Sequence, residues 1–260
     1  PLPAGARTRT RLKFAVAIPA RLESTRLPRK VLADIGGKAM LQRVLEESGK
    51  APSISQVVLC TDSDEVASHA RTWGTRVIMT SPECSSGSER IASVIAQIDA
   101  DVVINVQGDQ PFVDPSIIES MCSVFRERTP TPSVVTPVYR LPAEKIDNPD
   151  AVKVVVGANH QALYFSRAAV PFVRGKERGE WLASGVHWGH VGMYGYRRDV
   201  LQRWSSLKPS PLEEAEKLEQ LRLLENGITI DTYEIVAQPR NTLSVDSPAD
   251  LETARRLVAQ

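Results

Sequence analysis

The chain has 260 residues, 42% of them hydrophobic, so it can bury the core of one large α/β domain or two small ones. A formal net charge of +1, and no apolar run of about 18 residues, argue against nucleic acid or a membrane as partner. Three cysteines without CxxC spacing, Cys60, Cys84 and Cys122, favour a reducing, cytoplasmic location over a disulfide scaffold or a zinc site. Residues 1–13 are basic and contain no acid, which predicts a flexible extension.

Strands and helices are predicted to alternate through the first half of the chain. Short apolar strands are expected at residues 14–18, 57–60 and 77–79, with helices at 38–48 and 64–73. This alternation is typical of right-handed βαβ units around a parallel sheet. We therefore predict an α/β fold whose mostly parallel sheet is flanked by helices, with ligands at the carboxyl ends of the strands.

A loop with four cations follows the first strand, which Pro19 is expected to end. The loop after the first strand is where α/β nucleotide binders hold phosphates, and residues 20–30 occupy that position. The loop matches neither GxxxxGK[ST] nor GxGxxG, so charged side chains rather than glycine backbone would bind the phosphates. The alternative is a basic loop that is simply solvated.

A fourth buried strand is predicted at residues 102–106, and it ends in a polar turn that contains Gly108 and Asp109. A carboxylate at such a strand end suits a Mg²⁺ ion that carries substrate phosphates. The alternative is that these residues merely form a turn. Thr61 and Asp62 follow the second strand in the same way, so they are expected at the same edge of the sheet.

Ser86 and Glu89 have the spacing of a capping box at the start of another predicted helix. Capping explains both residues but not Arg90, and the free amides of a helix N-terminus also suit a base or a phosphate. A further helix is predicted at residues 115–128, with a proline in its first turn.

The second half has a mixed pattern. Residues 171–184 have little regular pattern, which fits a mobile loop or a dimer arm. His187 and His190 would point to opposite faces of a strand, so a hydrogen-bonding role for His190 is favoured over a metal site. The strands expected in this half are 134–139, 152–156, 162–165, 187–196 and 228–233.

One continuous helix is predicted over residues 210–227, with Ser210 as N-cap and Glu213 completing a capping box. Any other role of Glu213 must compete with that structural one. A last helix is predicted to follow a second cap, and Asp246 stands just outside it. Because capping does not explain Asp246, it could complete a metal site together with Asp109.

Several short motifs stand in a specific order and spacing from about residue 13 to the C-terminus. They are residues 18–21 (IPAR), 24–28 (STRLP) and Lys30; 87–90 (GSER); 105–109 (NVQGD); 163–167 (LYFSR); and 190–196 (HVGMYGY), 209–213 (PSPLE), 218–222 (LEQLR) and 245–246 (VD). Together they resemble the 3-deoxy-manno-octulosonate cytidylyltransferases, also called CMP-Kdo synthetases.

The resemblance implies a homodimer with a nucleotidyltransferase-type, Rossmann-like α/β fold and a smaller mixed lobe for dimerisation and sugar binding. It implies one domain over residues 14–260: a nucleotide-binding half (14–130), a sugar-binding and dimerisation half (131–245) and a C-terminal helix returning to the core (246–260). The implied reaction is Mg²⁺-dependent, converting CTP and 3-deoxy-manno-octulosonate (Kdo) into CMP-Kdo and pyrophosphate for lipopolysaccharide synthesis.

The resemblance also assigns roles to individual residues. Arg21, Lys30, Asp109 and Asp246 would be catalytic, with the two aspartates as metal ligands. Arg26 is a weaker candidate for the triphosphate. The residues near the nucleotide would be Ala20, Arg21, Lys30, Thr61, Asp62, Ser86, Gly87, Ser88, Arg90 and Asp109, and those near the sugar Gln107, Arg167, His190, Tyr194 and Glu213.

The sequence departs from the family pattern at positions that flank these groups. Many members have glycine at Arg29, proline at Val31 and Ala39, and glutamate at Gln110. These differences concern loop rigidity and the choice of sugar rather than the reaction class. Two alternatives stay open: transfer to another acceptor, such as a different sugar acid, and a non-catalytic nucleotide-binding dimer.

Overall fold

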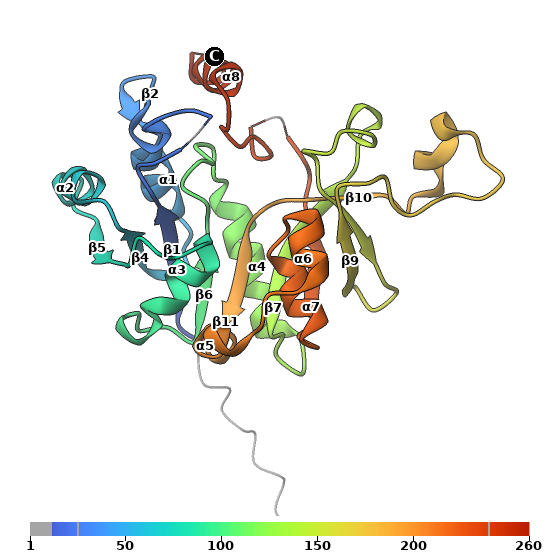
Figure 1. The fold of residues 1–260 in the computed structure, drawn as a ribbon, viewed down its shortest axis with the longest axis horizontal. Helices are drawn as coiled ribbons and strands as arrows, with labels where there is room; N and C mark the ends of the chain where they lie inside the picture. Colours follow the sequence, from blue (N-terminus) through green and yellow to red (C-terminus); the bar gives the residue numbers. More distant parts are fainter. Residues whose placement is uncertain (1–11, 25, 239, 260) are drawn as a thin grey trace, which may run out of the picture.

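The computed structural model describes residues 12–24, 26–238 and 240–259 (Figure 1). The flexible extension predicted for residues 1–13 therefore lies outside the described residues, apart from Leu12 and Lys13. None of the described helices has the length and apolar character that spanning a bilayer requires.

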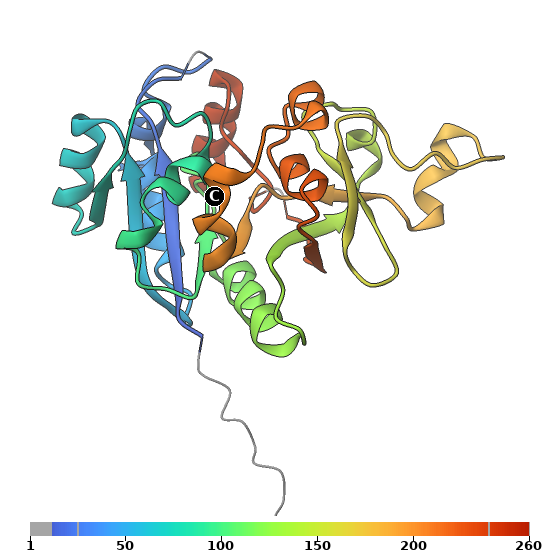
Figure 2. The same cartoon turned by 60° about the horizontal axis from the view of Figure 1, so that its bottom comes forward.

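The first half is a parallel sheet covered on both faces, as predicted. Its strands lie in the order β5 (Arg76–Met79), β4 (Ile54–Thr61), β1 (Phe14–Ala20) and β6 (Val102–Asn105). Alternate residues of β1 point to opposite faces, so Val16 packs in one core and Ala17 in the other. Helices α1 (Met40–Ser48), α2 (Asp64–Thr72) and α4 (Pro115–Glu127) cover the first face, and α3 (Gly87–Ser93) covers the second (Figure 2).

The prediction that Pro19 ends the first strand is wrong, because β1 continues to Ala20 and stays paired with β4. The pairing of β1 with β6 stops earlier, at Ala17. The Ala17 carbonyl accepts from the Val106 amide, so backbone groups two residues later face the same side. Pro19 faces the side where β6 no longer pairs with β1. Its missing N–H therefore removes no hydrogen bond from the sheet.

The second half extends the same sheet with mixed strands. Within the described residues the sheet has ten strands, and β11 (Tyr194–Arg197) joins the halves by pairing antiparallel with β6. The single strand predicted over residues 187–196 is in fact two, because Val191 to Met193 interrupt it. The remaining strands are β7 (Val134–Arg140), β8 (Lys153–Val156), β9 (Ala162–Ser166), β10 (Trp188–His190) and β12 (Ile230–Glu234).

The single helix predicted over residues 210–227 is also two helices, α6 (Pro211–Glu216) and α7 (Gln220–Glu225). The chain turns at Lys217, whose φ is 54°. The end of α6 is fixed to β9, because the Glu216 carboxylate accepts from Ser166 and its carbonyl accepts from Arg167. The predicted capping box at Ser210 is confirmed.

The remaining elements connect and close the fold. The C-terminal helix α8 (Pro248–Val258) returns to the first half and packs on β2 (Asp34–Ile35), which pairs with β3 (Lys38–Ala39). The irregular segment after β9 contains a short 3-10 helix, η4 (Arg178–Ser184), and Figure 1 shows it in gold, projecting from the second half. The other short helices are α5 (Arg198–Gln202), η1 (Lys30–Leu32), η2 (Ile95–Gln97), η3 (Ala143–Lys145) and η5 (Trp204–Ser206).

Candidate active site

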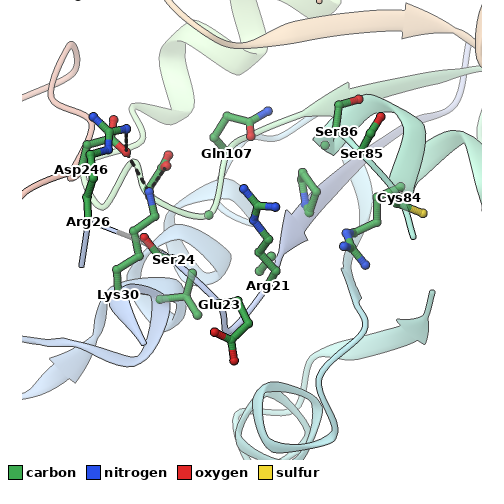
Figure 3. Close-up of a pocket in the computed structure, with 17 residues that line it drawn as sticks. Arg21, Glu23, Ser24, Arg26, Lys30, Cys84, Ser85, Ser86, Gln107 and Asp246 are labelled. Carbon is green, nitrogen blue, oxygen red and sulfur yellow. Dashed lines mark hydrogen bonds and ion pairs between the residues drawn. The ribbon is translucent and has the colours of Figure 1, made fainter. Parts of the chain in front are cut away.

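Two adjoining cavities open where the carboxyl ends of β1 and β6 face the second half. The first has a volume of about 390 Å³ and lies against the cationic loop (Figure 3). The second has a volume of about 1070 Å³ and reaches into the mixed half. Both cavities are lined by Arg26, Gly87, Gln107, Asp109 and Asp246, so two ligands could meet there.

Lys30 joins the two aspartates that were predicted to form a metal site. Its Nζ donates to Asp109 Oδ2 at 2.7 Å and to Asp246 Oδ1 at 2.9 Å. Burial by itself would lower the pKa of Lys30, but the two carboxylates outweigh burial and raise it. Arg26 also pairs with Asp246, at 3.0 Å, and Figure 3 shows both cations turned towards this carboxylate. Lys30 thus holds together carboxylates that are 137 positions apart in the chain.

The donor set at this point fits Mg²⁺ brought in with a substrate. The described residues contain no group of three or more histidine, cysteine, aspartate or glutamate side chains able to hold a metal by themselves. Mg²⁺ is usually bound by one or two carboxylates, with phosphates and water completing its coordination. Asp109 and Asp246 could supply those carboxylates, while the phosphates would come from the nucleotide.

The cationic loop presents its charges in different ways. Arg21 is exposed, lines the first cavity and makes no hydrogen bond or ion pair with any described residue. Arg29 has a left-handed backbone, with φ 57°, and its guanidinium pairs with Glu65 of α2. The glycine that many family members have here would adopt this φ without strain. Arg21 is thus the cation of this loop that is free to bind an anion.

Two glycines let the backbone come close to the first cavity. A Cβ on Gly87 would lie 2.9 Å from Pro19 Cγ and 3.2 Å from Gln107 Oε1. A Cβ on Gly108 would lie 3.2 Å from the Pro19 carbonyl oxygen. Ser86 caps α3 by accepting from the Glu89 amide. Ser86 also lines the first cavity, so the start of α3 faces it. Ala20, Ser86 and Gly87 are therefore placed where the nucleotide was predicted to bind.

The other residues predicted near the nucleotide lie either in the wall of the first cavity or behind it. Arg90 lines the first cavity although it is only 3% exposed, and it donates to Asp62 at 3.0 Å and to Thr80 at 2.5 Å. Thr61 and Asp62 are not among the residues that line either cavity. The capping box predicted at Ser86 forms only in part, because the Glu89 carboxylate accepts from Ser85 instead.

Ser88 lies in a buried polar network rather than on the cavity surface. Its hydroxyl lies 3.0 Å from the Tyr196 hydroxyl and donates to Glu219 Oε1 at 2.5 Å, while the Asn105 amide donates to it at 3.2 Å. Burial raises the pKa of Glu219, and none of the residues that the structure describes forms a hydrogen bond with its second, buried oxygen. Ser88 therefore connects α3 to the wall of the second cavity.

Four of the five predicted sugar-binding residues line the second cavity: Gln107, Arg167, His190 and Tyr194. Glu213 does not. It accepts two bonds from the Arg222 guanidinium, at 2.7 and 2.8 Å, and completes the cap of α6. The guanidinium of Arg167 donates to the carbonyls of Pro149 and Glu216.

His190 has a hydrogen-bonding environment, as predicted. Its Nε2 lies 3.0 Å from Thr136 Oγ1, and Thr136 donates its one hydroxyl proton to the Met193 carbonyl at 2.8 Å. His190 Nε2 must therefore be the donor, which leaves Nδ1 as an acceptor. Burial lowers the pKa of His190 to about 3, so the ring is neutral near pH 7. His187 instead contacts the Pro171 carbonyl, 2.9 Å away.

Among the residues that line the second cavity and were given no role from the sequence are Lys217, Glu219 and Gln220. The prediction of one continuous helix hid them, because it gave residues 217–220 a purely structural place. The signal that could have found them is the polar pair Glu219 and Gln220, which directly follows the apolar Leu218. The turn at Lys217 is what brings this segment to the cavity.

Comparisons with known proteins identify the class. The sequence model of the family described as Cytidylyltransferase matches residues 15–230. A solved cytidylyltransferase from Leptospira borgpetersenii has a TM-score of 0.63 at 18% identity, over 95% of this chain and 87% of that one, which shows the fold alone. The fold, the two cavities and the family match together define a nucleotidyltransferase that is a cytidylyltransferase.

Closer relatives identify the family. The 3-deoxy-manno-octulosonate cytidylyltransferases of Chlorobium limicola and Escherichia coli are 43% and 41% identical, each over 95% of this chain and 98% and 97% of their own. A solved CMP:2-keto-3-deoxy-manno-octonic acid synthetase complexed with CTP has a TM-score of 0.88 at 40% identity, covering 95% of this chain and 99% of that one. The chain belongs to the 3-deoxy-manno-octulosonate cytidylyltransferase family, and the resemblance predicted from its motifs is confirmed.

Proposed function

We propose that this chain transfers CMP from CTP to Kdo, with Mg²⁺ as cofactor and pyrophosphate as the second product. The observation that carries the proposal is the meeting of two cavities at Gln107, Asp109 and Asp246. The relatives support both substrates, because they are named for transfer to this acceptor and the solved relative holds CTP. The product would serve the synthesis of lipopolysaccharide.

The chemistry requires little covalent participation by the protein. The anomeric oxygen of the acceptor forms a bond to the α-phosphorus, the bond from that phosphorus to the leaving pyrophosphate breaks, and the hydroxyl proton passes to solvent. Such a transfer depends on positioning and on neutralising charge. Bound to Asp109 and Asp246, Mg²⁺ would neutralise phosphate charge and lower the pKa of the attacking hydroxyl.

On the nucleotide side, cations would stabilise the departing pyrophosphate. Arg21 is exposed in the first cavity and available to bind phosphate oxygens in a bidentate way. Lys30 stands beside the shared edge of the two cavities, where it would place a point charge near the α- and β-phosphates. Charge placed in advance at the leaving group is a large contribution to such catalysis.

On the acceptor side, the groups match a polyhydroxylated acid. Arg167 and Lys217 supply positive charge in the second cavity for a carboxylate. His190 Nδ1, as an acceptor, suits a sugar hydroxyl. Gln107 lines both cavities, so its amide would contact the acceptor close to the reacting phosphate.

A substrate panel tests the reaction class and the acceptor together. Pyrophosphate release is measured with each of four nucleoside triphosphates, against Kdo, other sugar acids and a polyol phosphate. We expect turnover with CTP and Kdo only in the presence of Mg²⁺. Turnover with a different acceptor would replace Kdo in the proposal, and CTP binding without turnover on any acceptor would support a non-catalytic dimer instead.

The metal ligands are tested with Asp109→Asn, which keeps the size of the side chain. We expect it to remain folded and to lose turnover by about 10²-fold or more, as when one charge-stabilising group is removed. The matched control is Asp99→Asn, because Asp99 is 84% exposed and, among the described residues, its carboxylate pairs only with Lys13 at the far end of β1. Full activity in Asp109→Asn would overturn the metal assignment.

The homodimer belongs to the same proposal. The segment around η4 projects from the second half, and it exposes Phe172 by 74% and Val186 by 43%. Exposed apolar side chains on a projecting segment are suited to pack against a second copy. Light scattering should give twice the chain mass, and a monomer mass would refute the dimer. The cytoplasmic location predicted from the cysteines stays a prediction.

A further inference from the structure

A fully buried lysine lies beneath the acceptor cavity, and the proposed reaction does not use it. Lys153 of β8 is 0% exposed. Its Nζ donates to the Asn148 carbonyl at 2.8 Å; no carboxylate of the described residues lies within ion-pair distance of it, and Asp147 and Glu216 act on its charge only from farther away. Lysine is rarely buried without an ionic partner, because removing an ammonium from water is costly. Its position therefore calls for a role that an apolar side chain would not fill.

That role lies in the turn that connects η3 to β8. Residues 148–152 form one wall of the second cavity. Three carbonyls of this wall accept from three separate donors: Asn148 from Lys153, Pro149 from the Arg167 guanidinium at 2.9 Å, and Val152 from the His190 amide at 3.0 Å. Two of these donors belong to residues proposed to bind the sugar. The wall and the sugar-binding side chains therefore share one set of hydrogen bonds.

We propose that Lys153 is a positioning residue for the acceptor: it fixes the Asn148 carbonyl, and through this turn it fixes Arg167 and His190. The inference rests on the proposed function, because it assigns the second cavity to the sugar acid. Lys153 itself does not line the cavity, so it acts through the turn and not by contact. The first cavity shares no residue with the turn, so nucleotide binding should not depend on Lys153.

Lys153→Met separates this role from simple packing. Methionine has nearly the same length and fills the same space, but it has neither a charge nor a donor. Replacing a buried charge by an apolar side chain of similar volume is often neutral or stabilising. A purely structural lysine would therefore tolerate methionine, whereas a positioning lysine would leave the turn free to move.

The experiment compares Lys153→Met with the wild type and with Lys208→Met, a control that removes an exposed lysine of the same half. We expect the KM for Kdo to rise at least about tenfold, which corresponds to about 1.4 kcal/mol. The KM for CTP and the melting temperature should stay within error. Hydrogen exchange of the amides of Asn148 and Ala151, which donate within the turn, should become faster.

An unchanged KM for Kdo, or an equal rise in the KM for CTP, would overturn the inference. Lys153→Gln serves as a second variant if methionine prevents folding, since glutamine keeps one donor without the charge. A third measurement uses the wild type alone: Kdo should slow exchange in residues 147–152, and no protection there would also overturn it. These exchange data need no turnover, so a failure of the proposed reaction would be seen separately in the substrate panel.

Discussion

Lys30 gives the sharpest prediction, because one ammonium occupies both carboxylates proposed to bind the metal. The perturbation is Lys30→Met, which removes the charge and keeps most of the side-chain volume. The side chains of Lys30 and Asp109 are 15% and 22% exposed, so the hydrogen bonds that join them are only partly screened by water. Asp246 is 36% exposed and also pairs with Arg26.

The magnitude follows from what a metal must displace. A hydrogen bond to a charged group contributes about 1.5–3 kcal/mol, and in the free enzyme Mg²⁺ must break at least one of the two bonds that Lys30 makes. Removing the ammonium should therefore tighten metal binding by about tenfold to a hundredfold. Turnover should move in the opposite direction, by about 10²-fold or more, because a charge that stabilises pyrophosphate is lost.

The assay titrates Mn²⁺, detected by electron paramagnetic resonance, into nucleotide-free protein. Arg21→Met is the matched control: it removes an equal charge from the same cavity, but Arg21 makes no bond to either aspartate. It should slow turnover yet change Mn²⁺ affinity by less than about threefold. If Lys30→Met binds Mn²⁺ no more tightly than the wild type, the idea that Lys30 competes with the metal fails. Equal tightening in both variants would point to general electrostatics instead.

Three further predictions concern the cavity wall, the charged cap and the thiols. Gly87→Ala should destabilise the fold by about 1–3 kcal/mol in urea unfolding and weaken CTP binding in calorimetry, since its Cβ would lie 2.9 Å from Pro19. Glu213→Gln should lower the free energy of unfolding by about 3 kcal/mol, because it leaves the partly buried Arg222 charge unpaired. The KM for Kdo should not change. A selective rise in that KM would show that Glu213 contacts the sugar. Burial raises the pKa of the Cys60 and Cys122 thiols to about 12, so at pH 8 a thiol reagent should label Cys84 alone. Because Cys84 lines the first cavity, CTP should protect it from the reagent. Labelling that CTP does not slow would contradict the proposed position of the nucleotide.

The parts of the site that could be predicted from the sequence are those governed by sheet topology. Parallel strands bring their carboxyl ends to one edge, so Asp109 after β6 and the cationic loop after β1 had to lie near each other. The position of Asp246 depended on the resemblance, because a residue between the last strand and the last helix has no fixed place in a sheet. The structure brings Asp109 and Asp246 together through Lys30.

Predictions failed where contacts between distant segments override local pattern. The apolar spacing of residues 210–227 is that of one helix, yet Ser166 and Arg167 of the β9 segment bind both ends of Glu216 and stop α6 there. The prediction that Pro19 ends the first strand failed for a related reason. Whether β1 can contain a proline at this position depends on where the neighbouring β6 ends, not on the residues of β1. Such information is absent from a window of neighbouring residues.

The same tertiary contacts explain why Glu213 and Glu219 differ although each lies in a motif of the family. Glu213 lies before the turn at Lys217, where Arg222 of α7 can reach back and neutralise it. Glu219 lies after the turn, which directs it to Ser88 and to the wall of the second cavity. No described residue donates a hydrogen bond to Glu219 Oε2, so this buried oxygen would gain a partner if a sugar hydroxyl reached it. The break in the helix thus separates a carboxylate that stabilises the fold from one that lines the second cavity.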